Sequence, residues 1–263
     1  MAIAGQLTGV AVVTGGASGI GAACCHELSR RGATIAVVDR DIDRAQVVAQ
    51  DIKGATAWAG DVTDEAALAD VAARIEATFG PVSILVNSAG IIQTPDRPAD
   101  LAMSVWDDVV RVDQRGTYVA SVVFAKAMLT RRQGSIVNIA SIAGMRAMPL
   151  HAYAPAKAAV ISMTACLAAE WGPAGIRVNA VSPGYTRTPA LQGAIDRGQR
   201  DVALLESNAA LGRLVLPSDI AKAVAFLAGP DASAITGINL PVDAGWLAAT
   251  PWNTYGGLRA HGN

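Results

Sequence analysis

The feature that constrains this chain most is an apolar run that leads directly into a glycine-rich turn and then into a helix. Residues 10–13 are all Val or Ala, which indicates a short buried strand. Glycines at 15, 19 and 21 follow, and Ile20, Cys24 and Leu28 then recur at helical spacing. Such a turn brings backbone N–H groups and the positive end of a helix against an anion. We therefore expect a pyrophosphate site here; the alternative is a turn that is merely tight.

The alternation of apolar runs and helical patterns continues along the chain. Hydrophobic residues make up 52% of the sequence and aromatic residues only 5%, so the core must consist of Ala, Val, Ile and Leu. This composition suits parallel strands buried on both faces. No linker or internal repeat interrupts the pattern, and 263 residues is an ordinary length for one α/β domain. We predict a single domain over 1–263, a doubly wound three-layer α/β sandwich whose seven-stranded parallel sheet uses residues 10–13, 34–38, 55–59, 84–86, 135–140, 176–181 and 238–242.

Several segments between and beyond these strands have less regular patterns. Residues 101–132 are predicted to be mostly helical, and a last helix is expected around 220–227. Residues 189–216 have the weakest periodicity, so we expect short helices there that form a mobile substrate lid. The tail from Gly245 contains several aromatic side chains, which we expect to pack on the protein or on a neighbouring subunit.

Residues suited to ligand binding stand where the predicted strands end. Asp39, Asn87 and Ser141 each follow an apolar run, as do Gly15 and Pro183. In an open parallel sheet, ligands bind in the crevice outside the carboxyl ends of the strands. The convergence of these residues on one edge predicts the ligand site.

Asp39 indicates which dinucleotide would bind. It lies 18 residues beyond Gly21, close to the spacing of about 20 expected for a carboxylate that binds the adenosine ribose. A carboxylate there repels a 2′-phosphate and so favours NAD over NADP, although Arg40 could attract that phosphate. The alternative for Asp39 is a cap on a helix that begins near Ile42.

Tyr153 and Lys157 are four residues apart, so on a helix they lie on the same face. A phenol with a pKa of about 10 is a poor acid or base at neutral pH. An adjacent ammonium stabilises the phenolate and is expected to move the pKa of Tyr153 toward the working range. Because Ser141 is expected at the same edge, these three side chains form a candidate catalytic set.

Charge and cysteine content exclude other classes of protein. The net charge is −1 and no basic block occurs, which argues against nucleic-acid or membrane-surface partners. Cys24, Cys25 and Cys166 are odd in number and form no CxxC pair, so we expect buried apolar thiols in a reducing cytosol and no metal site. No basic, apolar leader precedes the first strand and no apolar run approaches about 20 residues, so we expect a cytoplasmic protein.

Taken together, these motifs resemble the short-chain dehydrogenase/reductase family from residues 14–21 to residues 242–245. The resemblance implies a Rossmann-like sheet that binds NAD or NADP. It implies that Tyr153 is the general acid/base, that Lys157 lowers its pKa and holds the nicotinamide ribose, and that Ser141 bonds the substrate oxygen. It assigns adenine contacts to Asp61 and Val62 and a carboxamide contact to Thr188. The whole implied cofactor site is Gly15, Ser18, Gly19, Ile20, Asp39, Asp61, Val62, Asn87, Ala89, Gly90, Tyr153, Lys157, Pro183, Gly184, Thr186 and Thr188.

The chain departs from the family pattern at three positions. Ser88 replaces an asparagine and Ala156 replaces a serine. Asp113 aligns with an asparagine that, in the family, holds water in a proton relay behind the lysine. We include Asp113 in the catalytic set and expect it to raise the pKa of a nearby Lys157. The alternative is a surface ion pair between Asp113 and Arg111 or Arg115.

The sequence therefore predicts an NAD-dependent dehydrogenase that interconverts a secondary alcohol (a polyol, cyclic or aryl carbinol) and a ketone. One alternative is a 3-oxoacyl-thioester reductase that acts on an acyl carrier protein, and another is a non-catalytic dinucleotide-sensing protein. The small-molecule substrate would meet an apolar pocket, and the helices from Leu101 and Tyr153 would pair subunits into a homotetramer. We expect His151 to be an exposed loop residue; the predicted pocket residues are Met145, Met148, Leu150 and Leu191.

Overall fold

The computed structural model describes residues 6–259, which fold around one parallel sheet of seven strands. The strand order is β3-β2-β1-β4-β5-β6-β7, so the chain starts in the middle of the sheet and is wound outward in both directions. This order confirms the predicted doubly wound α/β fold. The strands are β1 (Val10–Thr14), β2 (Thr34–Asp39), β3 (Thr56–Ala59), β4 (Val82–Asn87), β5 (Gly134–Ile139), β6 (Ile176–Pro183) and β7 (Asn239–Val242).

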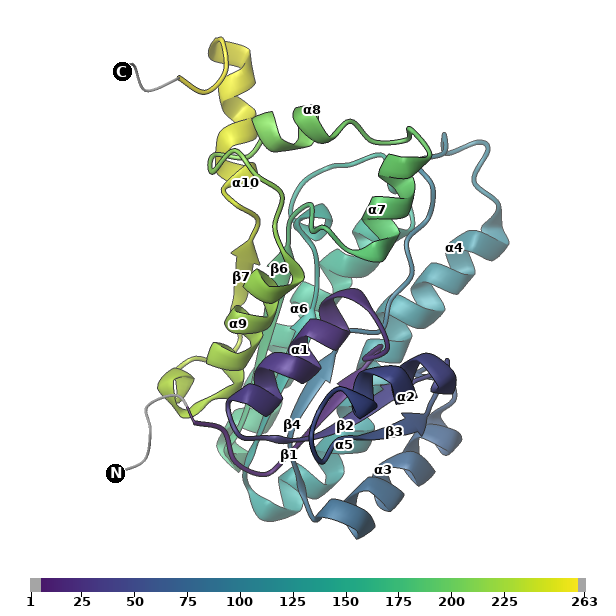
Figure 1. The fold of residues 1–263 in the computed structure, drawn as a ribbon, viewed down its shortest axis with the longest axis vertical. Coiled ribbons are helices and arrows are strands. Elements are labelled where there is room, and N and C mark those ends of the chain that lie inside the picture. The colour runs from purple at the N-terminus through teal and green to yellow at the C-terminus, as the bar shows by residue number, and fades with distance from the viewer. Residues whose placement is uncertain (1–5, 260–263) are drawn as a thin grey trace.

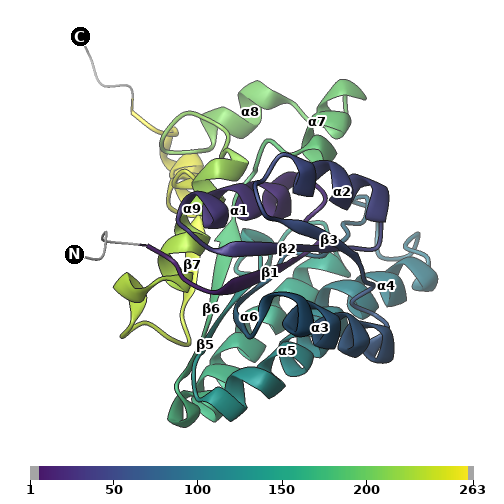
Figure 2. The ribbon, with the colours of Figure 1, turned by 60° about the horizontal axis from the view of Figure 1, so that its bottom comes forward.

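Helices cover both faces of the sheet, as Figures 1 and 2 show. Helices α1, α2 and α9 pack on one face, and α3, α5 and α6 pack on the other. The longer helices are α1 (Gly19–Arg30), α2 (Ile42–Gln50), α3 (Glu65–Phe79), α4 (Met103–Val109), α5 (Thr117–Arg131), α6 (Tyr153–Trp171), α7 (Pro189–Asp196), α8 (Val202–Ser207) and α9 (Pro217–Ala228). Short helical turns are η2 (Ile142–Gly144), η3 (Gly172–Ala174) and η4 (Pro230–Ala232).

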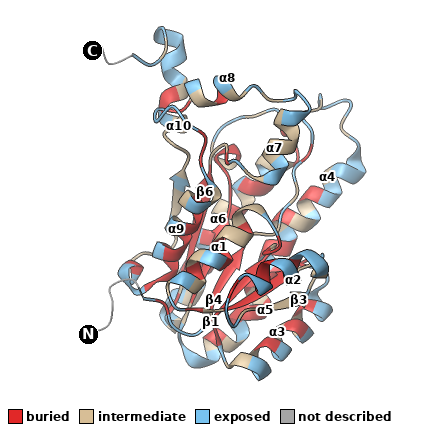
Figure 3. Cartoon of the chain, in the orientation of Figure 1, coloured by how far each residue is buried: buried red, intermediate tan, exposed pale blue. Residues whose placement is uncertain are grey.

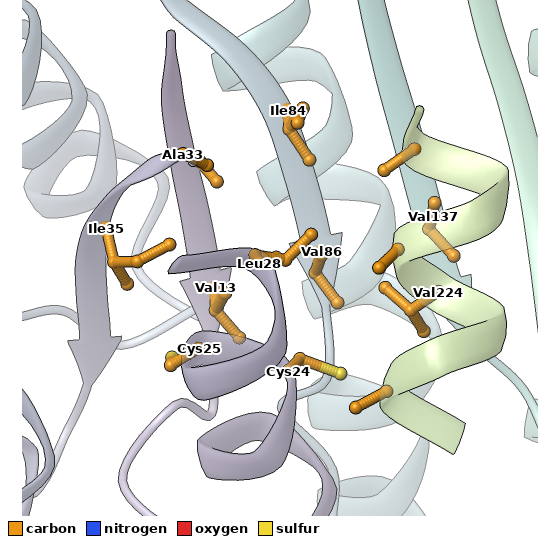
Figure 4. Close-up of a cluster of buried hydrophobic side chains, with 14 of the residues drawn as sticks. Val13, Cys24, Cys25, Leu28, Ala33, Ile35, Ile84, Val86, Val137 and Val224 are labelled. Carbon is orange, nitrogen blue, oxygen red and sulfur yellow. The ribbon is translucent and has the colours of Figure 1, made fainter. Parts of the chain in front are cut away.

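The core lies along the sheet because neighbouring residues of each strand face opposite layers. In β1, Val13 packs with the α1 and α9 layer, whereas Val12 packs with the α3 and α5 layer. Burial is concentrated along the strands and the helix faces turned toward them (Figure 3). Each fully buried aliphatic side chain of this kind stabilises the fold by about 1.5–3 kcal/mol relative to exposure. Figure 4 shows part of the first layer, including Val13, Cys24, Leu28, Val86, Val137 and Val224.

The cysteines divide between core and surface. Cys24 and Cys25 are buried, and burial raises the pKa of the Cys24 thiol to about 12, so it stays protonated and inert. Cys166 is exposed, so the prediction that it is a buried thiol was wrong. It lies on the outward side of α6, and the sequence of this Ala-rich helix does not distinguish its two sides.

The predicted helical stretch at 101–132 consists of three parts. Helix α4 leads into a π-helical segment, η1 (Val110–Gly116), before α5 begins. The π-helical segment contains Asp113, which is fully buried. Wide π-helical turns are rare and often lie at functional sites.

The lid and the tail agree only in part with expectation. Helices α7 and α8 are the short helices predicted within 189–216. The helix around 220–227 is not the last, because α10 (Trp246–Ala249) and a 3₁₀ turn, η5 (Thr250–Tyr255), follow it. The ring of Trp246 packs edge-on against Tyr185, with 5.7 Å between centroids. Trp252 and Tyr255 are 47% and 88% exposed, so of these three aromatic side chains only Trp246 packs on the protein as expected.

Among the described residues, no helix is both long and apolar enough to cross a bilayer.

Candidate functional site

A cavity of about 1120 Å³ opens along the carboxyl edge of the sheet. The register brings this edge together, since Thr14 pairs with Val38 on one side and with Asn87 on the other. The glycine turn, the ends of β2, β4, β5 and β6, and helix α7 all line the cavity. Its volume exceeds the roughly 300–1000 Å³ of a typical single-ligand pocket, as a dinucleotide and a substrate together would require.

The glycine turn fits a pyrophosphate. A Cβ at Gly15 would lie 2.6 Å from the backbone nitrogen of Ala89, and one at Gly21 would lie 2.1 Å from the carbonyl oxygen of Gly15. Ser18 is the N-cap of α1 but makes no side-chain capping bond, and the first turn carries no acidic residue. The first N–H groups of α1 therefore remain available to an anion in the cavity.

Asp39 is held at the end of β2 by two backbone donors. Its Oδ2 accepts from the N–H of Ala17 at 3.1 Å and its Oδ1 accepts from the N–H of Asp41 at 3.0 Å. The helix cap is Asp41, which accepts from the N–H of Arg44, so the alternative that Asp39 caps α2 is wrong. Asp39 thus connects the glycine turn to β2 and lines the cavity, with the exposed Arg40 and Arg44 also on its wall.

Tyr153 and Lys157 stand on the first turns of α6, as the spacing predicted. Lys157 Nζ lies 5.5 Å from the centre of the Tyr153 ring. The Lys157 side chain is buried, and its ammonium donates to the carbonyl oxygen of Ile139 at 3.0 Å. Ser141 follows β5, and its Oγ accepts from the N–H of Ala143 at 3.1 Å, which leaves its O–H proton free to donate. All three side chains line the cavity.

Asp113 completes this group from the π-helical segment. Its Oδ2 lies 3.1 Å from Lys157 Nζ, and its Oδ1 accepts from the N–H of Ile91 at 2.8 Å. Arg111 pairs instead with Asp108, so the alternative of a surface ion pair for Asp113 is wrong. A Cβ at position 90 would lie 3.0 Å from Asp113 Oδ2 and 3.4 Å from Lys157 Nζ, so Gly90 leaves room for the pair.

Burial and Asp113 change the expected pKa of the phenol. Burial raises the pKa of Tyr153. Lys157 and Ser141 both act to lower the pKa of this phenol, whereas Asp113 acts to raise it, and the net pKa of Tyr153 lies above its usual value. The prediction that lysine lowers it was therefore incomplete for this state of the protein. Burial is the largest influence on Lys157 and lowers its pKa, but Asp113 and Tyr153 together raise it by more, so the net pKa of Lys157 is raised and it stays an ammonium.

Asn87 is the one predicted cofactor residue that does not line the cavity. Its Nδ2 donates to Ser121 Oγ at 2.9 Å and to Asn138 Oδ1 at 2.8 Å. Asn138 in turn donates to Thr164 Oγ1 at 3.0 Å. This buried polar network connects β4 and β5 to α5 and α6 behind the site, so Asn87 positions the elements that carry the catalytic side chains.

Gln93 lines the cavity and was missed in the sequence. It is 5% exposed, and its Oε1 accepts from the N–H groups of Ala152 at 2.6 Å and Tyr153 at 3.0 Å. The only signal was a single amide in the loop that follows Gly90. Of the predicted pocket residues, Met148, Leu150 and Leu191 line the cavity, whereas Met145 and the half-buried His151 line an adjacent groove of about 390 Å³.

Comparisons with known proteins agree with this geometry. A family model described as enoyl-(acyl carrier protein) reductase matches residues 15–247. Galactitol 2-dehydrogenase of Rhizobium johnstonii is 38% identical over 242 residues, which cover 90% of this chain and 94% of the relative. The chain belongs to the short-chain dehydrogenase/reductase family. D-Threitol dehydrogenase of Mycolicibacterium smegmatis is also 38% identical, with 90% and 92% covered. This member of the family is an oxidoreductase that acts on alcohol groups with a nicotinamide cofactor.

Solved structures extend the comparison. A chain described as ribose-5-phosphate isomerase from Brucella melitensis 16M superposes with a TM-score of 0.94 at 52% identity, with 97% of this chain and 99% of that chain covered. A structure described as ElxO with NADP bound has a TM-score of 0.86 at 30% identity, with 92% and 99% covered. The fold is thus shared with a chain described as an isomerase and with one whose structure contains NADP.

Proposed function

We propose that the chain is an NAD-dependent dehydrogenase that interconverts a secondary alcohol of a polyol or cyclic alcohol and the corresponding ketone. The observation that carries the proposal is the meeting of Tyr153, Ser141 and Lys157 on one wall of the dinucleotide-sized cavity. Its polyol-acting relatives support the substrate class.

The chain's own residues supply the proton chemistry. NAD, when bound, takes the hydride from the carbinol carbon. Tyr153, as the phenolate, takes the proton of the substrate hydroxyl, while Ser141 donates a hydrogen bond to the same oxygen. The Lys157 ammonium stabilises the phenolate. In the reverse direction, the Tyr153 phenol returns its proton to the carbonyl oxygen.

Different residues of the cavity would bind different parts of the cofactor. The N–H groups at the start of α1 would hold the pyrophosphate, and Asp39 would accept from the adenosine ribose hydroxyls. Asp61 and Val62, which line the cavity, would contact the adenine, and Thr188, which lies near Gly19, would contact the carboxamide. Tyr153→Phe tests the proposal because it removes the proton acceptor and keeps the ring. We expect NAD-linked oxidation across a panel of polyols and cyclic alcohols to fall at least a hundredfold, with cofactor binding retained.

The preference for NAD rests on Asp39. We expect NAD to exceed NADP at least tenfold in kcat/KM, about 1.4 kcal/mol, because a fixed carboxylate repels the 2′-phosphate. Arg40 and Arg44 would attract the 2′-phosphate, so Asp39→Ala should reduce the difference in kcat/KM between NAD and NADP. Steady-state rates with both cofactors decide the point, and an equal or reversed preference would overturn it.

Two specific observations favour other functions. The family model is described as an enoyl-(acyl carrier protein) reductase, which would act on the carbon–carbon double bond of an enoyl thioester. The 3-oxoacyl-thioester reductase alternative would instead reduce a ketone and prefer NADPH. The 52% identical chain is described as an isomerase, which would convert ribose 5-phosphate without added cofactor. Assays with each substrate separate these functions from the alcohol dehydrogenase. Cofactor binding without turnover on any substrate would indicate the dinucleotide-sensing alternative.

The quaternary structure and the lid are part of the proposal. Helix α6 is apolar on its outward side as well as toward the sheet, and Tyr118 on α5 is 49% exposed. Pairing of these helices between subunits would cover that surface in a homotetramer. Light scattering that reports a monomer at micromolar concentration would contradict this, and hydrogen exchange over 189–216 tests whether α7 and α8 move as a lid.

A further inference from the structure

Gln93 holds the start of the catalytic helix through one end of its amide. Its Oε1 accepts from the N–H groups of Ala152 and Tyr153, the first backbone donors of α6. These donors lack partners within the helix, so the amide oxygen caps it. Because two N–H groups point at this atom, it must be the oxygen, and the orientation of the amide is determined.

The other end of the same amide has no partner. Gln93 Nε2 is buried and makes no hydrogen bond within the described residues. A buried donor without a partner is unfavourable and rare. A helix cap needs only an acceptor, which an ionised Glu would supply at this position without an unused donor. Capping therefore explains the oxygen of Gln93 but not its NH₂ group.

The place of Gln93 in the cavity wall indicates what could pair with its NH₂ group. Gln93 lines the cavity together with Tyr153 and Ser141, and it is hydrogen-bonded to the backbone of Tyr153 itself. A neutral NH₂ donor is matched to a hydroxyl or carbonyl oxygen, and the nearby ammonium of Lys157 is already paired with Asp113. A ligand oxygen there would be a second oxygen, separate from the one at the phenol.

We propose that Gln93 Nε2 donates a hydrogen bond to a substrate oxygen adjacent to the reacting carbinol. This inference rests on the proposed function and narrows its substrates to vicinal diols and their α-hydroxy ketones. A substrate without the second oxygen leaves the buried donor unpaired, and a site built in this way discriminates strongly against it.

The test compares matched alcohols that differ only in the second oxygen: 2,3-butanediol against 2-butanol, and trans-1,2-cyclohexanediol against cyclohexanol. The readout is the ratio of kcat/KM for diol over mono-alcohol with NAD. Gln93→Glu keeps an acceptor for Ala152 and Tyr153 but replaces the donor by a second acceptor. Gln93→Met is similar in size and removes both. We expect the wild-type ratio to favour the diol and to fall at least about tenfold in both variants.

The melting temperature distinguishes the capping role of Gln93 Oε1 from the proposed donor role of Gln93 Nε2. Gln93→Met should lower the melting temperature because it loses the cap, whereas Gln93→Glu should retain it. Gln93→Met adds no charge, so it is also the control for the carboxylate that Gln93→Glu places in the cavity wall. Effects of charge on Tyr153 act on both alcohols and cancel in the ratio.

Each remaining outcome is decisive. An unchanged ratio in both Gln93 variants, with a lower melting temperature only in Gln93→Met, would make Gln93 a helix cap and nothing more. A fall in Gln93→Glu without a fall in Gln93→Met would assign the effect to charge and overturn the inference. If the wild type turns over alcohols without preferring diols, the inference fails alone. If it turns over no alcohol, the proposed function fails, and the inference fails with it.

Discussion

Two carboxylate–cation ion pairs are formed from the same stretch of helix, but they differ in distance and, above all, in exposure to solvent. Asp108 and Arg111 meet at 2.6 Å, and their side chains are 54% and 55% exposed. Asp113, a few residues further on, meets Lys157 at 3.1 Å, and these side chains are 0% and 5% exposed. The shorter pair lies in water, where such pairs contribute about 0–1 kcal/mol. The longer pair is buried, and loss of one partner would leave the other charge unsolvated.

The comparison shows that burial decides what a carboxylate does for its neighbours. The buried carboxylate of Asp113 acts to raise the pKa of both Lys157 and Tyr153, whereas neither member of the surface pair contributes to the pKa of these two groups. Substitutions in each pair test whether burial accounts for this difference.

The largest effect is expected from Asp113→Ala. It leaves the Lys157 ammonium buried without its carboxylate and the N–H of Ile91 without its acceptor. We expect a loss of about 3–5 kcal/mol in unfolding free energy at pH 7 and a substantial loss of rate. Urea unfolding and kcat measure the two effects. A variant as stable and as active as the parent would show that the buried pair has no role.

Asp113→Asn should keep activity and shift its pH dependence. Alcohol oxidation needs the phenolate, so kcat rises with pH through the apparent pKa of Tyr153. Removal of the negative charge at position 113 removes one cause that raises this pKa. The rising limb should therefore move to lower pH in the variant. A pH–rate profile from about pH 6 to 10 checks this, and coincident profiles would contradict it.

Glu27→Gln tests an ion pair of intermediate burial. The Glu27 side chain is 10% exposed, and its partners Arg30 and Arg31 are 68% and 22% exposed. The hydrogen bond from Arg30, with help from Arg31, lowers the pKa of Glu27 to about 2 despite partial burial. Because the folded pKa is depressed, the stabilisation is complete above the unfolded pKa of about 4.3 and is lost as pH falls toward 2.

With screening by solvent, we expect Glu27→Gln to lower the unfolding free energy by about 1 kcal/mol at pH 7. Urea unfolding at several pH values should show the difference from the parent shrinking below about pH 4.3. A constant difference across that range would assign the effect to packing.

The smallest effect is expected from Asp108→Ala. Both members of this pair are exposed, so the unfolding free energy should change by less than about 0.5 kcal/mol, and kcat and its pH profile should match the parent. The variant is also the control for Asp113→Ala, since it removes an aspartate from the preceding helical turn. A large effect here would mean that position in the helix, and not burial, accounts for the Asp113 result.

Local signals in the sequence were sufficient for the strands and for the edge at which they end. The glycine turn, Asp39 and Ser141 all follow apolar runs, and parallel pairing then brings them together. The π-helical turn at Asp113 was not predictable, because it depends on packing rather than on propensity.

Long-range contacts account for what the sequence does not predict. Asn87 is predicted to bind the cofactor from its place in a motif, but no local pattern indicates that its side chain bonds Ser121 and Asn138 on other elements. Gln93 was overlooked because the N–H groups it accepts from lie 59 and 60 residues further along the chain. Contacts of this kind follow from the tertiary fold and leave no periodic pattern in the sequence.

The central position of the neighbouring strands β1 and β4 in the sheet has a consequence for synthesis on the ribosome. β1 pairs with β4 although the registered residues Val10 and Val82 are 72 positions apart, and the other edge of β4 must then wait for β5, with Ile84 and Ser135 51 positions apart. At about 5–20 residues per second, that interval lasts roughly 3–10 s. During it, an apolar strand edge that is central in the finished sheet is open to other nascent chains. We therefore expect chains arrested between β4 and β5 to be the species that aggregates or that a chaperone captures.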